Sequence, residues 1–227
     1  MKKALLVFTF AFMITTAWSQ SSDKKFMFGV KIQPALAWFR VDAPDEAHFE
    51  SDGLPFGFGY GLITDFPFAD RYAFSTGLEI AYRGGKTVHT YTEPNGIGVT
   101  NFTQKTKLSL QFVEIPLTLK MRTNEIGYIT YFFQAGLAPG YAIRTKAEIT
   151  VNDVVIDDNA DFSDEINEFN LSMILSAGAE YSLGGSTSLL LGITFNNGFI
   201  DLLNDEKYDD KVKGNSNYLA LMLGVMF

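Results

Sequence analysis

Isolated charged residues recur along this 227-residue chain. In segments where every second residue is apolar, they occupy the positions between, together with small residues. If these positions face an enclosed space, the charges must pair, because an isolated buried charge is very costly. A salt-bridge network that plugs the space is the favoured interpretation, since a small lumen has little spare volume. A proton or ion path, or a binding site, is the alternative. The residues are Lys31, Glu79, Arg83, Glu114, Lys120, Glu168 and Glu180, and we expect Glu114 and Lys120 to belong to the plug.

Histidine offers the other candidate chemistry, because its imidazole can act as a base near neutral pH. The chain has two, His48 and His89. Both fall in expected loops, and no nucleophile motif accompanies either. We therefore expect solvated loop histidines, no catalytic residue and no cofactor, with a hydrolase acting at the rim of a barrel as the alternative.

Acidic residues gather in two segments, and carboxylates at this density can hold Ca²⁺. Neither segment has the spaced Asp, Gly and terminal Glu of an EF-hand loop, so we expect solvated acids and no metal, with calcium as the alternative. The acids are Asp153, Asp157, Asp158, Asp161, Asp164 and Glu165, then Asp201, Asp205, Glu206, Asp209 and Asp210. The absence of cysteine excludes disulfides and thiolate metal sites.

Period-two alternation predicts the elements that position these residues. Bulky apolar residues alternate with Gly, Ala, Ser, Thr and isolated charges in eight segments: 28–38, 56–66, 72–82, 113–121, 129–141, 169–181, 189–195 and 219–227. The lumen of a small barrel could not hold so many Phe, Tyr and Leu side chains. Small residues inside and bulky apolar residues outside are typical of a barrel in lipid. We expect an all-β fold, an eight-stranded antiparallel up-and-down transmembrane β-barrel, with aromatic girdles such as Phe66, Tyr72 and Phe227 at one end and Trp38, Tyr82 and Phe195 at the other.

Residues 1–19 have the basic start, apolar run and small-residue cleavage site of a signal peptide. Residues 20–227 would then form the mature barrel domain, exported by a cleaved signal. Connectors alternate between short and long, which is typical of periplasmic turns and outer loops, so both termini should be periplasmic. The long connectors, 40–55, 84–104, 144–165 and 200–216, carry charges of −4, 0, −5 and −2. The net charge of −8 argues against nucleic acid as a partner.

Two of the long connectors should form hairpins beyond the membrane, one around Pro94–Gly96 and one around Asn152-Asp153. Pro34, Pro116 and Pro139 lie inside expected strands, so we expect bulges or rim positions there. The apolar parity slips between Phe112 and Val113, which predicts a bulge. Two bulky residues fall on the inner face and should pack in the lumen: Phe132 and Met222.

Three segments carry a resemblance to a known family: 28–31, 113–120 and 134–137, of which Val113-Glu114-Ile115-Pro116-Leu117-Thr118-Leu119-Lys120 is the most specific. On these, the mature chain resembles the PorT-like outer-membrane β-barrel family of Bacteroidetes. The resemblance implies fold and location but no reaction, since that family shares no catalytic motif. The C-terminus separately resembles the signal read by the outer-membrane assembly machinery, with Leu221, Leu223, Val225 and Phe227 at alternate positions.

Together these features predict a non-enzymatic, monomeric protein of the cell outer membrane with a filled lumen. Its partners should be the outer-membrane lipid, the barrel assembly machinery and an extracellular or periplasmic protein. Exposed strand edges and acidic loops would contact that protein partner. One group of the PorT-like family serves protein secretion and gliding, so the resemblance implies a link to such machinery as one form of partner binding. A narrow transport or ligand-binding barrel is the alternative.

Overall fold

The computed structural model describes residues 26–42, 49–51, 53–94, 99–164, 166–203 and 213–227. The expected signal peptide, His48, Glu165 and the acidic residues of 205–210 lie outside these ranges. Within them, no helix is long and apolar enough to cross a membrane.

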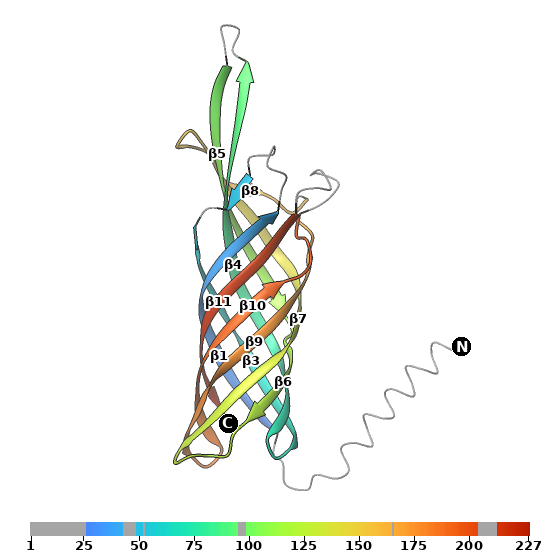
Figure 1. Ribbon diagram of the computed structural model, residues 1–227, viewed down its shortest axis with the longest axis vertical. Coiled ribbons are helices and arrows are strands. Elements are labelled where there is room, and N and C mark those ends of the chain that lie inside the picture. The colour runs from blue at the N-terminus through green and yellow to red at the C-terminus, as the bar shows by residue number, and fades with distance from the viewer. Residues whose placement is uncertain (1–25, 43–48, 52, 95–98, 165, 204–212) are drawn as a thin grey trace, which may run out of the picture.

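In the described ranges, eleven strands make one antiparallel sheet that closes on itself (Figure 1). Eight strand positions form the ring, because β5 and β6 are two halves of one position, and β1 pairs with both β3 and β11. The short strand β2 pairs with β4, and β8 pairs with β7. The strands are β1 (Met27–Asp42), β2 (Phe49–Ser51), β3 (Phe56–Ala69), β4 (Tyr72–Pro94), β5 (Val99–Glu114), β6 (Leu117–Arg122), β7 (Ile129–Val151), β8 (Val154–Asp161), β9 (Phe169–Gly184), β10 (Thr187–Gly198) and β11 (Lys213–Met226). The predicted eight-stranded antiparallel barrel is confirmed.

Alternation sorts the side chains of each strand between the lumen and the outer face. On β3, Leu62 is 57% exposed while Asp65 is completely buried. The outer face carries rows of rings, with Phe28 against Phe227 (5.6 Å between centroids) and Trp38 against Phe195 (6.4 Å). An exposed surface of this kind needs an apolar solvent, and a closed barrel leaves no unpaired strand edge within it.

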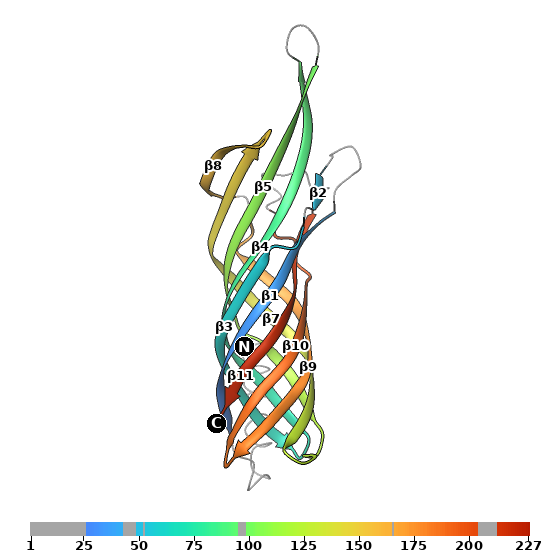
Figure 2. The ribbon, with the colours of Figure 1, turned by 90° about the vertical axis from the view of Figure 1, so that its left-hand side faces the viewer.

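The two ends of the barrel differ, as Figures 1 and 2 show. At the lower end of the views the strands join by short turns, and the two ends of the ring meet, since the Phe227 N–H donates to the Phe28 carbonyl (2.7 Å). At the upper end β4 and β5 rise far above the other strands as one hairpin, and β7 and β8 form a second (Figure 2). Both hairpins were predicted. Asn152 and Asp153, with φ of 48° and 64°, make the tight turn of the second.

The prolines do not sit at bulges, so that prediction is wrong for all three. Pro34 and Pro139 lie within β1 and β7, and their pairing with β3 and β9 keeps its register. Pro116 separates β5 from β6, yet the register is the same just before and just after the proline, both against β4 and against β7. The barrel therefore accommodates each of the three prolines without a register shift beside it.

The predicted bulge between Phe112 and Val113 is also misplaced. The inward parity of β5 runs without a break through Leu110, Phe112 and Glu114, all of which are buried. The extra residue belongs to the partner strand β7, where Gln111 pairs with Arg144 and Phe112 with Ala142, leaving Ile143 unmatched. The apolar parity changes at this point because the chemistry of the lumen changes, from charged below to apolar above.

Candidate functional site

The lumen is the candidate site, and its lower part holds four charged residues from three ring strands, here called the lower cluster: Asp65, Lys120, Arg122 and Glu180. The Lys120 Nζ lies 2.8 Å from Asp65 Oδ2 and 2.5 Å from Glu180 Oε1. Arg122 contacts Asp65 as well and reaches Glu180 at 3.4 Å. Lys120 is fully buried, and its ammonium also lies 4.7 Å from the centre of the Phe132 ring.

Nearer the middle of the barrel lies the middle cluster: Lys31, Glu79, Arg83 and Glu114. Lys31 Nζ is 2.8 Å from Glu79 Oε2, and Arg83 donates two hydrogen bonds to Glu114, at 2.5 and 2.6 Å. This fork geometry is the strongest form of an arginine–carboxylate pair. The guanidinium also stacks on the Tyr218 ring, 3.8 Å from its centre.

Each cluster contains two cations and two anions, so neither leaves a net charge inside the barrel. Desolvation of eight ionised groups is costly, and short, multiple hydrogen bonds within each cluster offset that cost. The arrangement can hold strands together from opposite sides of the ring. It offers no unpaired cation or carboxylate among the described lumen residues to move an ion or attack a substrate.

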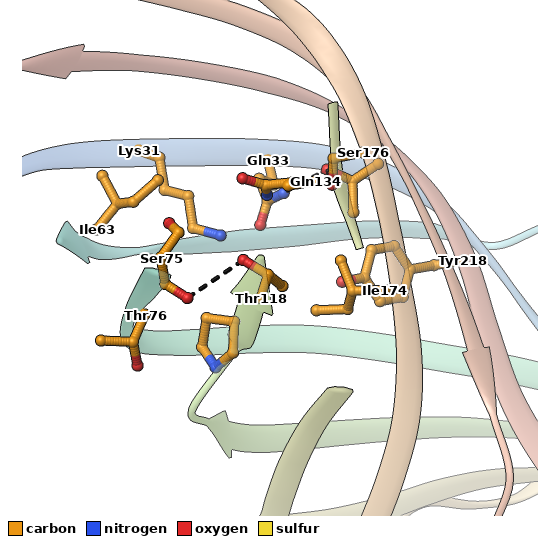
Figure 3. Close-up of a pocket in the computed structure, with 12 residues that line it drawn as sticks. Lys31, Gln33, Ile63, Ser75, Thr76, Thr118, Gln134, Ile174, Ser176 and Tyr218 are labelled. Atoms are coloured by element: carbon orange, nitrogen blue, oxygen red, sulfur yellow. Dashed lines mark hydrogen bonds between the residues drawn. The ribbon is translucent and has the colours of Figure 1, made fainter. Parts of the chain in front are cut away.

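A neutral polar layer lies beside Lys31 of the middle cluster (Figure 3). Gln33 Nε2 donates to Thr194 Oγ1 (3.2 Å), and Thr194 also meets the Ser176 hydroxyl at 3.0 Å. Thr118 donates to the Ser75 carbonyl at 3.2 Å. The cavity lined by these residues measures about 10 Å³, which is room for about one water molecule. At this level the lumen is therefore filled.

Apolar side chains complete the filling. A lower group consists of Ile63, Phe132, Leu190, Met222 and Met226. This group confirms that Phe132 and Met222 pack in the lumen. Gly178 and Gly192 make room for the Phe132 ring, which would lie 2.8 and 3.2 Å from a Cβ added at either position.

At the upper mouth a second apolar group, here called the upper cap, closes the barrel: Phe39, Leu110, Phe112, Ala142, Ile166, Leu202 and Leu203. The cap combines strand residues with loop residues that backbone bonds fix in place. Asp201 Oδ1 accepts from the N–H groups of Leu203 (3.0 Å) and Gly214 (2.8 Å). Sequence reasoning placed Asp201 among calcium candidates, whereas here its carboxylate organises the loop.

The structure brings together six predicted lumen charges in the two clusters: Lys31, Glu79, Arg83, Glu114, Lys120 and Glu180. Glu168 was placed wrongly, because it precedes β9, is exposed, and accepts a hydrogen bond from the Tyr141 hydroxyl. Sequence reasoning missed Asp65 and Arg122. Parity could have identified both, since Asp65 continues the small-residue face of β3 and Arg122 follows Lys120 by two residues.

The other candidate residues lie apart from the lumen clusters. The His89 ring stacks on Tyr91, which stacks on Phe102, both at 5.5 Å on the β4–β5 hairpin. In the described parts of the chain, no three His, Asp or Glu side chains are grouped to hold a metal. The C-terminal signal residues Leu221 and Phe227 are each 43% exposed on the outer face, and Leu223 and Val225 are half-buried there.

The chain is similar to several solved barrels and to one family of known proteins. Solved barrels that resemble the chain include Neisserial surface protein A (14% identity, 91% of this chain and 98% of that one, TM-score 0.49) and OprG from Pseudomonas aeruginosa (11%, 88% and 93%, TM-score 0.44). No curated protein matches. Residues 18–204 match the family described as outer membrane protein beta-barrel domain. This match spans most of the chain, which therefore belongs to that family of outer-membrane β-barrels.

Proposed function

We propose that this protein is a non-enzymatic outer-membrane barrel that presents its β7–β8 hairpin to a protein partner outside the cell. One observation carries the proposal: β8 begins with three consecutive apolar residues that are exposed, and this strand lies higher than the lipid-facing surface of the barrel. Val154, Val155 and Ile156 are 61, 53 and 65% exposed. Successive strand side chains point to opposite faces, so both faces of the strand carry apolar side chains in water, and exposed apolar surface of this kind is typical of a protein contact site.

The backbone of β8 supports the same role. Among the described strands β8 pairs with β7 alone, so its second edge has free N–H and C=O groups that a partner strand can join. Asp157, Asp158 and Asp161 follow the apolar segment, and acidic side chains on an edge strand oppose pairing between copies. A partner strand with apolar and basic residues would fit this edge.

The filled lumen favours this role over transport. Two ion clusters, the polar layer and the upper cap fill the lumen, and the two cavities that Gln33 lines in the middle of the barrel measure about 10 Å³ each. We place the short-turn end and both termini in the periplasm, after removal of a signal peptide, because bacterial barrels have short periplasmic turns. A PorT-like role in secretion or gliding would be one instance of partner binding.

Site-specific photo-crosslinking in cells tests the proposal. A photoreactive phenylalanine in place of Val155 should give a discrete crosslinked species, whereas the same residue in place of Ile126 should not. Ile126 is a matched control, because it is 65% exposed in a turn at the opposite end. Replacement of Val154 and Ile156 by Ser should abolish the Val155 product. Equal crosslinking from both positions, or none from Val155, would contradict the proposal.

A further inference from the structure

The outer face of β7 changes from apolar to basic between two adjacent residues. Below the change, Tyr82 of β4 and Tyr141 and Ile143 of β7 are 43, 49 and 51% exposed among the lipid-facing residues. Directly above it lies Arg144, which is exposed and pairs with Gln111 of β5, and further up β5 lies Lys107, whose side chain is 50% exposed. The bulge in β7 sets this boundary, since it leaves Ile143 and its neighbour Arg144 both on the outside.

A pocket of about 390 Å³ opens at this boundary. Its basic lining residues outside the lumen are Lys107, Arg144 and Lys146, and Phe56 and Tyr82 form its apolar side. The pocket lies where β3, which begins at Phe56, leaves residues 83–86 of β4 unpaired on that side, below the short strand β2. Gly84 keeps the space open, since its missing Cβ would lie 2.5 Å from the Leu108 carbonyl oxygen and 4.0 Å from Pro55.

The pocket has more positive than negative charge. Arg144 has no ion-pair partner among the described residues, and Lys146 Nζ lies 3.5 Å from the Asn159 carbonyl oxygen. Lys107 pairs with Glu148 at 3.2 Å. Among the described residues, Asp158 is the one carboxylate that lines the pocket, and the buried Arg83 at its back is already neutralised by Glu114.

We propose that this pocket binds the phosphate group of an anionic lipid in the outer leaflet. Arginine matches phosphate with two parallel hydrogen bonds, and lysine adds point charge. The lipid chains would lie against Tyr82, Tyr141 and Ile143, which continue the surface directly below. An acidic protein segment would use the same charges, but the continuity of the pocket with the lipid-facing surface favours a lipid. This proposal is independent of the role given to β8.

The test measures lipid binding to the refolded full barrel domain in phosphatidylcholine nanodiscs that contain a small fraction of bisphosphorylated lipid A. We expect Arg144→Gln with Lys146→Gln to weaken binding by about thirtyfold, because each basic residue at a membrane surface contributes about 1 kcal/mol and about 1.4 kcal/mol corresponds to a tenfold change in affinity. Arg144→Lys should retain part of the affinity. Lys105→Gln is the matched control, since Lys105 is similarly exposed (49%) but pairs with Asp153 beyond the pocket.

Two further arms identify the ligand. Dephosphorylated lipid A should bind the native protein about as weakly as lipid A binds the double variant, and millimolar inorganic phosphate should not displace bound lipid A. Equal affinity for phosphorylated and dephosphorylated lipid would overturn the proposal, as would native affinity in the double variant. Displacement by free phosphate would also overturn it, since the pocket would then be a site for the ion. In each of these cases the crosslinking from Val155 of β8 would be unchanged, so the two proposals are tested separately.

Discussion

Lys120 is the residue on which the lower cluster depends, because its ammonium contacts both Asp65 and Glu180 and has no exposed surface. Lys120→Met keeps most of the volume but leaves two buried carboxylates with only Arg122 between them. We expect a loss of about 3–5 kcal/mol in the free energy of unfolding, measured by urea unfolding in lipid vesicles. Lys105→Met, which removes an exposed pair, should leave it almost unchanged, because solvent screens such pairs. Equal effects would show that the lower cluster does not stabilise the barrel.

The Asp153 carboxyl, at the tip of the β7–β8 hairpin, allows a test by pH titration. A hydrogen bond and the charge of Lys105 hold the pKa of the Asp153 carboxyl below its usual range. Since the folded pKa is depressed, the pair stabilises the hairpin at neutral pH, and this contribution is lost as the pH falls through the folded pKa. Carbon-13 NMR titration should show the low pKa, and Lys105→Met should raise it towards the ordinary value. An unchanged pKa in the variant would mean that Lys105 is not its cause.

At the scale of elements, the β7–β8 hairpin depends on its turn. Asn152 has a positive φ, its N–H donates to the Thr103 carbonyl (3.0 Å), and its Oδ1 accepts from the Thr103 N–H (3.1 Å). Asn152→Val places a β-branched residue at positive φ and removes the side-chain bond. We expect faster amide exchange across β8 with no change in barrel melting temperature.

Asn152→Gly separates the two causes, because glycine accepts the backbone angle but lacks the side-chain oxygen. Its exchange rates should lie between those of the native protein and Asn152→Val. Native rates in the valine variant would mean that contacts other than the turn hold β8 in place.

The positions of the strands could be predicted from the sequence wherever the two faces of a strand have the same surroundings along its whole length. Alternation located all eight ring strands because lipid outside and small residues inside impose one pattern. It failed at Phe112, where the inner face turns apolar beneath Leu202 and Leu203, residues far away in sequence. It failed at Glu168 because parity has no meaning before a strand begins. The geometry of the clusters depends on which strands face each other across the ring, and no local pattern specifies that.

For the whole molecule, the filled lumen predicts a barrel that does not conduct. Planar bilayers containing the refolded protein should show no steady unitary current. Arg83→Ala combined with Lys120→Ala removes a large side chain from each cluster and should introduce measurable current or leak, provided that circular dichroism shows a folded barrel. Steady current through the native protein would contradict the closed lumen and would favour the transport alternative.

The unequal height of the strands also has a consequence within the plane of the membrane. The β4–β5 and β7–β8 hairpins rise from neighbouring ring positions, while the other strands end lower (Figures 1 and 2). The molecule therefore has a tall flank and a short flank, and rotation about the membrane normal changes what a neighbour meets. A partner bound to the tall flank would fix the rotation of the barrel about the membrane normal. An assembly built on such contacts would have a defined direction in the plane of the membrane.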